Sequence, residues 1–197
     1  MTSHMNDQRC SWVGSDPLMV EYHDTEWGVP VHADQKLFEF MVLDAMQAGL
    51  NWRIVLEKRP NFKQALDDFD PRSIAKYSDR ELDRLVSTEG IIRNRQKLGA
   101  SITNARAVLK VQQDFGSLDS YLWQFVDGKP KINAWNLASQ IPATTPESEA
   151  MSTALKSRGF KFVGPTICYA FMQAAGLVND HITGCYRYAE VVNASVL

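Results

Sequence analysis

The sequence has few cysteines and no long apolar run, and both shortages exclude whole classes of protein. Its cysteines are Cys10, Cys168 and Cys185, an odd number that cannot all pair, so we do not expect a disulfide framework. Free or metal-bound thiols are typical of a reducing compartment. The longest apolar stretches, residues 40–43 and 167–172, are far too short to cross a bilayer, and the chain does not begin with an apolar segment. We therefore expect a cytoplasmic protein that does not enter a membrane.

The chain also lacks a strong excess of either charge. Lys and Arg number 21 against 23 Asp and Glu, which gives a net charge of −2. A protein of this charge is not attracted to nucleic acid as a whole, so any DNA binding requires a local basic patch. The sequence is 45% hydrophobic over 197 residues, which is enough to build the core of one domain.

Signals for β-strands are scarce, whereas signals for helices recur along the chain. No pair of alternating runs is joined by a tight Asn-Gly or Asp-Gly turn. Apolar residues at helical spacing, N-cap residues and glycine or proline stops predict an all-α fold of short helices with short connections. Pro60 is expected to end the second helix, and residues 141–146 are expected to form a loop. The predicted helices cover residues 34–48, 51–58, 78–90, 94–115, 118–126, 148–157 and 166–175, with one more short helix opened by Asp70 and Pro71.

The first of these helices carries a carboxylate in an apolar setting. Apolar side chains surround most of its circumference, which is typical of a buried helix. Asp44 lies among them, and its neighbours in helical projection are Leu37, Phe40 and Ala48. A carboxylate there is paired, protonated or lining a cavity. Helix geometry favours two interpretations equally. Asp44 is either a structural residue paired with a backbone amide or an arginine, or a functional residue.

Four large aromatic residues, Trp12, Tyr22, Trp27 and Trp52, are concentrated toward the amino end. Tyr and Trp combine a flat apolar face with a polar tip, which suits stacking on a nucleobase. Composition alone favours ordinary core packing over such a role.

Cysteine and histidine occur in two pairs near opposite ends of the chain. Cys10 and His23 lie near the start, and His181 and Cys185 lie four residues apart near the end. Together they would make a tetrahedral Cys2His2 set for zinc. The large separation favours, by a narrow margin, two satisfied histidines and two buried thiols. A metal there would tie the two ends of the chain together, and its binding would stabilise the fold.

The segment between the last two predicted helices resembles a phosphate-binding connection. Phe160 and Phe162 flank a short hairpin, and Gly164 leads into the next helix, whose first amides are unpaired and suit a phosphate. The alternative is a plain connection with solvated lysines. Nearby positive charge comes from Lys156, Arg158 and Lys161.

A second group of basic residues lies in and before the longest predicted helix. We interpret it as a solvated helix face rather than as another contact with the DNA backbone. Its members are Arg93, Arg95, Lys97, Arg106 and Lys110.

Taken together, several sequence blocks resemble one family. The blocks are RCSWV at residues 9–13, DPL at 16–18, YHDTEWGVP at 22–30, QAGLNW at 47–52, KSRGFKFVGPTICY at 156–169 and LVNDH at 177–181. They resemble the bacterial 3-methyladenine DNA glycosylase I family, and the similarity extends from about residue 9 to about residue 186. The resemblance implies a helix-hairpin-helix glycosylase fold in one domain, residues 9–190, with the hairpin at about 159–166. Residues 1–8 and 191–197 are then expected to be flexible tails.

The resemblance also implies roles for individual residues. One structural zinc ion would be held by Cys10, His23, His181 and Cys185, and would join the two terminal segments. The base pocket would be formed by Tyr22 and Trp52, with Trp12 and Trp27 close by. Two positions depart from the family: Asp44 stands where the family has a glutamate, and Met19 stands where it has an aromatic residue. Contacts with the DNA backbone are implied for Lys161, Gly164 and Thr166.

The implied reaction is hydrolysis of the bond between 3-methyladenine and deoxyribose in double-stranded DNA, during base excision repair. The nucleotide would be flipped out of the duplex. Stacking on Tyr22 and Trp52 would favour the cationic base, and Asp44 would accept a hydrogen bond from its exocyclic amine. Asp180 is a candidate for activating water, although a structural role beside His181 is favoured. We expect a monomer that releases free 3-methyladenine.

Three alternatives remain at this point. The chain could be a non-catalytic DNA-binding module that uses only the hairpin, although Asp44 in an aromatic setting argues against it. It could be a glycosylase with an altered range of bases. An enzyme that also cuts the abasic strand is disfavoured, because such relatives use a lysine where this chain has Thr166.

Overall fold

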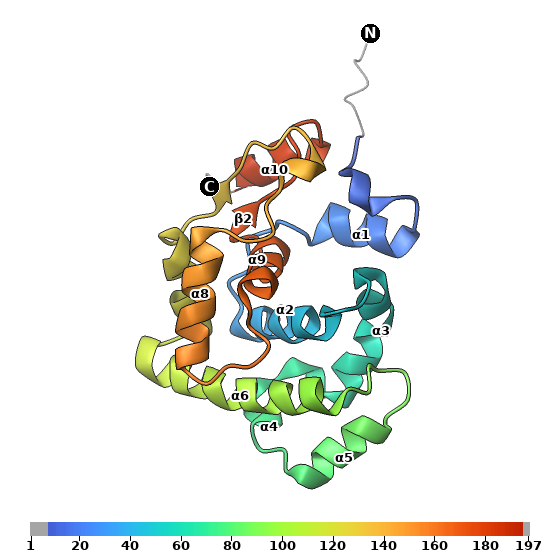
Figure 1. The fold of residues 1–197 in the computed structure, drawn as a ribbon, viewed down its shortest axis with the longest axis vertical. Helices are drawn as coiled ribbons and strands as arrows, with labels where there is room; N and C mark the ends of the chain where they lie inside the picture. Colours follow the sequence, from blue (N-terminus) through green and yellow to red (C-terminus); the bar gives the residue numbers. More distant parts are fainter. Residues whose placement is uncertain (1–7, 195–197) are drawn as a thin grey trace.

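The computed structural model describes residues 8–194, and almost all of its regular structure is helical (Figure 1). The prediction of a mostly helical protein is therefore confirmed. No helix in this range is both long and apolar enough to cross a membrane. The α-helices are α1 (Pro17–Thr25), α2 (Asp34–Gln47), α3 (Trp52–Ala65), α4 (Pro71–Ile74), α5 (Asp79–Ser87), α6 (Arg95–Phe115), α7 (Leu118–Trp123), α8 (Pro146–Ser157), α9 (Pro165–Ala174) and α10 (Tyr186–Ala194). Single 3-10 turns are η1 (Ser11–Val13), η2 (Asp67–Phe69), η3 (Gln124–Val126) and η4 (Ala138–Gln140), and the strands are β1 (Lys131–Ile132) and β2 (Val178–Asn179).

The helices begin where local capping chemistry satisfies their first amides. The Asn51 side chain accepts from the Arg53 amide at 2.8 Å, as predicted for the start of α3. At α5 the predicted capping box is present, with the Ser78 amide donating to Glu81 at 2.9 Å. Each such cap is worth about 1 kcal/mol. Most predicted helices consequently appear within a few residues of their expected bounds.

Helix α3 does not stop at residue 58 as predicted, because Pro60 is accommodated inside it and the helix continues to Ala65. An internal proline removes one hydrogen bond and costs about 3 kcal/mol. The turn beyond it buries Phe62 completely, which is worth about 1.5–3 kcal/mol. The Leu66 amide also donates to the Phe62 carbonyl at 2.9 Å. Burial thus offsets most of the local cost.

The two terminal helices, α1 and α10, are absent from the sequence-based prediction. Helix α10 corrects the expected tail, because residues 191–194 are helical and Val191 is only 2% exposed. Gln8, placed in the other tail, accepts a hydrogen bond from the Tyr186 amide at 3.2 Å. Both segments are held by packing against each other, which no local pattern reveals. The rest of the expected tails, residues 1–7 and 195–197, lies outside the described residues.

Helix α2 lies at the centre of the molecule, where it packs against α3, α6 and α9 (Figure 1). Every residue from Leu37 to Met46 is buried. The prediction of a helix buried on all sides is therefore confirmed. Among these residues Glu39 is paired with Arg59 at 2.6 Å, and Asp44 has no such cation.

The segment after α1 runs directly against the end of α9. The Gly28 amide donates to the Gln173 carbonyl at 3.0 Å. Gly176 has φ +71°, and a Cβ atom there would lie 2.3 Å from the carbonyl carbon of Val29. Only glycine fits this approach. The amino-terminal segment and the C-terminal third of the chain thus share one close-packed seam, and the candidate site lies beside it.

Candidate functional site

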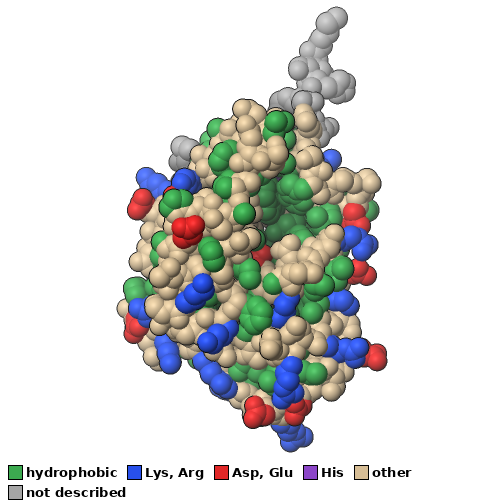
Figure 2. Space-filling model, in the orientation of Figure 1, with side chains coloured by type: hydrophobic (Ala, Val, Ile, Leu, Met, Phe, Trp, Pro, Cys, Tyr) green, Lys and Arg blue, Asp and Glu red, His purple; other side chains and the backbone are tan. Residues whose placement is uncertain are grey.

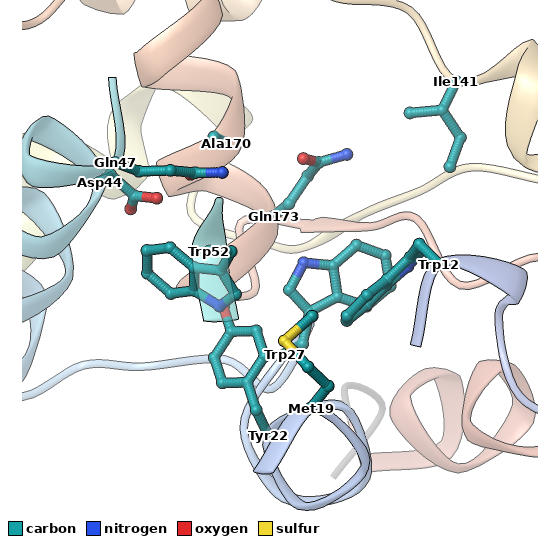
Figure 3. Close-up of a pocket in the computed structure, with 10 residues that line it drawn as sticks. All are labelled: Trp12, Met19, Tyr22, Trp27, Asp44, Gln47, Trp52, Ile141, Ala170 and Gln173. Carbon is teal, nitrogen blue, oxygen red and sulfur yellow. The ribbon is translucent and has the colours of Figure 1, made fainter. Parts of the chain in front are cut away.

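A cavity of about 220 Å³ opens between α1, α2, α3 and α9 (Figure 3). In the space-filling view of Figure 2 a hollow with hydrophobic walls opens on the face that is drawn. The four predicted aromatic residues, Met19 and Asp44 are all brought together around the cavity. Its lining residues are Trp12, Met19, Tyr22, Trp27, Asp44, Gln47, Trp52, Ile141, Ala170 and Gln173.

The aromatic rings form a continuous wall. Tyr22 on α1 and Trp52 at the start of α3 are tilted by 54° with ring centroids 5.4 Å apart. Trp12 and Trp27 meet edge to face at 5.0 Å. Tyr22 is buried, and burial raises its pKa well above the ordinary value, so the phenol remains protonated. The wall therefore offers electron-rich faces without introducing a negative charge.

Asp44 is the buried acidic group of this cavity. The residue is 4% exposed, and its Oδ2 atom is buried without a hydrogen-bond partner within the described chain. Burial raises the pKa of the Asp44 carboxyl well above its ordinary value. An unpaired buried carboxylate costs several kcal/mol of stability. The group is thus poised for a partner that the folded chain does not supply, which removes the structural alternative of an arginine or amide partner.

Asp44 also borders a neighbouring cleft, which it shares with Gly49, Leu50 and Thr166. Thr166 belongs to the first turn of α9, directly after the hairpin. The cleft therefore leads from the aromatic cavity to the segment predicted to contact DNA.

Cys10, His23, His181 and Cys185 form a buried cluster at the seam between the terminal segments. One ligand atom of each residue lies within 4.8 Å of the others. Cys185 Sγ is 3.5 Å from His23 Nε2 and 3.6 Å from His181 Nδ1. None of these residues is more than 3% exposed. The four side chains therefore meet in one place and could hold a metal ion.

The surroundings of the cluster fit a metal ion. His23 Nδ1 is held by Asp24 Oδ1 at 2.8 Å, and His181 Nε2 is held by the Trp27 carbonyl at 3.0 Å. The other nitrogen of each ring faces the cluster. Metal-binding histidines characteristically anchor their second nitrogen in this way. Asp24 is fixed in turn by Arg9 at 2.7 Å.

The cluster and the cavity share aromatic side chains. Trp27 meets His181 edge to face at 4.6 Å, and Trp12 meets His23 at 5.4 Å. Since Trp12 and Trp27 also line the cavity, the cluster positions two of its walls. The predicted metal ligands and the predicted pocket residues thus form one packed unit.

Residues 158–164 connect α8 to α9 in the predicted hairpin. Asn104 of α6 fixes its backbone, because it accepts from the Lys161 amide at 2.8 Å and donates to the Lys161 carbonyl at 3.0 Å. Gly164 precedes Pro165 as the N-cap of α9, and no side chain caps the helix. The side chains of Lys161 and Thr166 are exposed. Gly164 and Thr166 therefore lie at the start of α9, and Lys161 is exposed on the hairpin that precedes it.

The remaining basic residues are mostly engaged within the protein. Arg158 of the hairpin is paired with Asp114 at 2.7 Å. The expectation of a solvated face is wrong for Lys97, which is 6% exposed and donates to the Met46 and Ala48 carbonyls at 2.9 and 2.6 Å. A cation at the C-terminal end of α2 interacts favourably with the helix dipole and with the unpaired carbonyls there. Lys97 thereby fixes the end of the helix that carries Asp44.

Asp180 does not line the cavity, and its oxygens are already occupied. The residue is 1% exposed. Asn133 and Trp135 donate to Oδ1, and Tyr169 and Gln173 donate to Oδ2, all at 2.6–2.8 Å. A carboxylate saturated by donors and remote from solvent is unsuited to activating water. The candidate role as a base is therefore set aside in favour of the structural role.

Two amides that line the cavity, Gln47 and Gln173, were not predicted from the sequence. Gln47 lies three residues after Asp44, so helical spacing would have placed it on the same face. Gln173 gives no comparable signal, because its place depends on the packing of α9 against the amino-terminal segment.

Comparisons with known proteins agree with this geometry. The sequence model of the methyladenine glycosylase family matches residues 12–188. DNA-3-methyladenine glycosylase 1 of Escherichia coli K12 is 49% identical over 181 residues, which are 92% of this chain and 97% of the relative. A crystal structure of a 3-methyladenine DNA glycosylase I has a TM-score of 0.89 and 52% identity, covering 91% of this chain and 98% of that one. A variant enzyme of the same name, in complex with 3-methyladenine, has a TM-score of 0.88 and 35% identity, covering 92% of this chain and 97% of that one.

We predict that Asp44→Asn stabilises the protein at neutral pH. The folded pKa of Asp44 is raised, whereas the unfolded pKa is about 3.9. The contribution of Asp44 to stability is thus fully present below about pH 4 and is lost as pH rises through the folded pKa. Asn does not titrate, so the advantage of the variant over the native chain should grow with pH. Urea unfolding between pH 4 and pH 8 measures it.

The matched control is Asp127→Asn, which removes an exposed carboxylate from a turn. Its stability should follow the native profile. Parallel profiles for Asp44→Asn and the native protein would contradict the prediction.

Proposed function

This chain belongs to the methyladenine glycosylase family, and from that membership we infer that it excises 3-methyladenine from DNA by hydrolysing the N-glycosidic bond. Its curated relatives are named DNA-3-methyladenine glycosylases, and the match covers nearly the whole of both chains. The substrate is DNA that carries the alkylated base, and the product is the free base together with an abasic site. The protein is thus a hydrolase of DNA repair.

The observation that carries this function is the unpaired carboxylate of Asp44 in an aromatic cavity. Methylation at N3 makes the adenine of the nucleotide cationic. A cation in the cavity would give Asp44 the partner that it lacks, and the faces of Tyr22 and Trp52 would attract the charge further. A neutral adenine gains neither contribution. The cavity therefore selects the damaged base by its charge.

The chain's residues would act mainly by binding and orienting the base. The glycosidic bond is inaccessible within a duplex, so the nucleotide is flipped into the cavity at the cost of a few kcal/mol. A cationic base is already a good leaving group, so it needs less acid catalysis than a neutral base. Asp44 accepts a hydrogen bond from the exocyclic amine and balances the charge until the bond breaks. Water then attacks the sugar carbon.

We propose that the Cys10, His23, His181 and Cys185 cluster holds one zinc ion. Two thiols and two imidazoles are a typical structural zinc set, and four protein ligands leave no position for substrate or water. The ion would supply folding free energy rather than chemistry. The anchored second nitrogens of both histidines support the proposal.

We also propose that the hairpin grips the DNA backbone. The unpaired amides at the start of α9 and the Lys161 side chain are suited to phosphate oxygens. The cleft from Thr166 to Asp44 connects this grip to the cavity. A module that only binds DNA would not need that connection or a buried unpaired acid, which makes the non-catalytic alternative less suitable.

Three further expectations remain proposals. We propose that the protein works in the cytoplasm as a monomer. The three free cysteines agree with a reducing compartment. The hydroxyl of Thr166, in place of the lysine of strand-cutting relatives, supports a glycosylase without lyase activity.

Asp44→Asn should weaken the binding of 3-methyladenine by about 2 kcal/mol, or roughly thirtyfold in Kd. Asn preserves the size of the side chain but removes the charge and replaces one acceptor oxygen with a donor. Calorimetry with the free base, which is neutral once the bond has broken, measures the loss of the hydrogen bond. Release of the base from methylated DNA measures the loss of the hydrogen bond and of the charge balance together, and Asp127→Asn is the control for both. If Asp44→Asn binds the free base normally wherever it is folded, Asp44 is structural and the assignment is wrong.

Elemental analysis should find about one zinc ion per chain in the native protein. Cys185→Ser should lower the metal content and the melting temperature, because a ligand is lost. The matched control is Cys168→Ser, which alters a buried thiol outside the cluster. Equal metal content in all three proteins, or none in the native one, would contradict the zinc proposal.

Lys161→Ala should weaken DNA binding and reduce the slope of log K against log salt by about 1, because one phosphate contact is lost. Lys63→Ala, which removes the same charge from α3 next to Asp68, should leave the slope unchanged. Equal slopes for the native protein and Lys161→Ala would show that Lys161 does not contact a phosphate.

A further inference from the structure

Gln173 presents a fixed polar group to the base cavity. It lies on α9 and lines the cavity, and its Nε2 donates to Asp180 Oδ2 at 2.8 Å. In Figure 3 the amide oxygen of Gln173 is turned to the side of Asp44 and Trp52, and the nitrogen to the side of Ile141. Within the described residues no hydrogen bond is recorded to that oxygen.

Asp180 determines which end of the amide enters the cavity. An unanchored glutamine can rotate its amide and offer either a donor or an acceptor. Here a rotation would bring the amide oxygen against the carboxylate of Asp180, so that two acceptors faced each other.

The position of Asp180 is fixed from several sides. Trp135 can only donate, and it occupies Oδ1 at 2.7 Å together with Asn133. The Tyr169 hydroxyl donates to Oδ2 at 2.6 Å. Burial and the neighbouring carboxylate raise the pKa of Tyr169 above its ordinary value, so it keeps its proton. Asp180 is therefore held as an acceptor at both oxygens.

We propose that Gln173 is a specificity-determining residue that reads the exocyclic group of the flipped base, and that Asp180 is its positioning residue. This inference rests on the proposed glycosylase function and deepens it. Adenine-type bases carry a donor amine at the position where guanine-type bases carry an acceptor oxygen. The amide oxygen of Gln173 accepts from the amine of 3-methyladenine and opposes the oxygen of 3-methylguanine.

The assignment divides recognition between two groups. Asp44 balances the positive charge, which both N3-methylated purine nucleotides carry, and accepts one of the two N–H groups of the exocyclic amine. Gln173 accepts the other N–H group, so it adds a second response to the donor or acceptor character of the exocyclic group. Charge alone would admit 3-methylguanine, so the second group completes the selection. A site built to hydrogen-bond one substrate rejects an analogue that lacks the matching group more strongly than an apolar wall does.

The test compares the two bases in Gln173→Met, a variant of similar shape without a polar group. Affinity for free 3-methyladenine should fall about fivefold, as expected for one neutral hydrogen bond, while affinity for free 3-methylguanine stays equal or rises. The ratio of the two Kd values, measured by calorimetry, should therefore fall at least fivefold. A purely structural role would weaken both bases alike and leave the ratio unchanged, which would overturn the proposal.

Two further variants separate the causes. Tyr169→Phe removes one donor to Asp180 but leaves the amide of Gln173 in place, so the ratio should remain native. Asp180→Asn allows the amide to rotate, so the ratio should fall as in Gln173→Met even though Gln173 is present. A native ratio in Asp180→Asn would show that Asp180 does not position the amide.

Release of 3-methyladenine from methylated DNA by the native protein is measured in parallel. If the native protein releases none, the proposed function itself has failed. If it releases the base and Gln173→Met discriminates as the native protein does, only the present inference is overturned.

Discussion

The rest of the structure depends on the closure of its two terminal segments against each other. Four ligand atoms from opposite ends of the chain come within 4.8 Å of one another, and Gly176 allows the backbone at Val29 to approach more closely than any side chain would permit. This seam holds the segment after α1 against the C-terminal end of α9. Because Trp12 and Trp27 pack on the histidines of the seam, the same contact that closes the fold also builds the aromatic wall of the cavity. The closure of the fold and the shape of the cavity therefore depend on the same residues.

Asp44, in contrast to the residues of the seam, lowers the stability of the fold. Its burial without a partner costs stability, and nothing in the packing of α2 requires a carboxylate there, since its neighbours are apolar. The cost is tolerable because the surrounding helix is firmly held: Glu39 is paired with Arg59, and Lys97 binds the carbonyls at the C-terminal end of α2. A rigid helix keeps the acid aimed at the cavity instead of letting it turn toward water. The cost of this unpaired buried carboxyl group is thus confined to the cavity, where the proposed cationic base would give it a partner.

Features that depend on interactions within a few residues could be predicted from the sequence, whereas features that depend on contacts between distant segments could not. Caps such as Asn51 and Ser78 and the all-round apolar pattern of α2 act within a few residues, so these helices could be predicted. The continuation of α3 past Pro60 depends on the burial of Phe62, and α10 depends on contacts with the amino-terminal segment. Neither has a local signal. The four residues of the terminal cluster could be grouped as a candidate metal site only through family resemblance, because spacing says nothing about residues that meet from opposite ends of the chain.

The proposed role of Gln173 could not be predicted from the sequence, because it depends on residues far from it in the chain. Its chemistry is set by Asp180, which is set in turn by Asn133 and Trp135 from the loop after β1 and by Tyr169 from α9. A glutamine amide can both donate and accept hydrogen bonds, and by itself it prefers neither role. The surrounding hydrogen bonds leave it one orientation, and that orientation is what turns a common side chain into an acceptor. Asp180 also directly precedes His181 of the terminal cluster. The seam that closes the fold therefore contacts the cavity lining at two places: at the aromatic wall, and at the Gln173 amide that Asp180 holds.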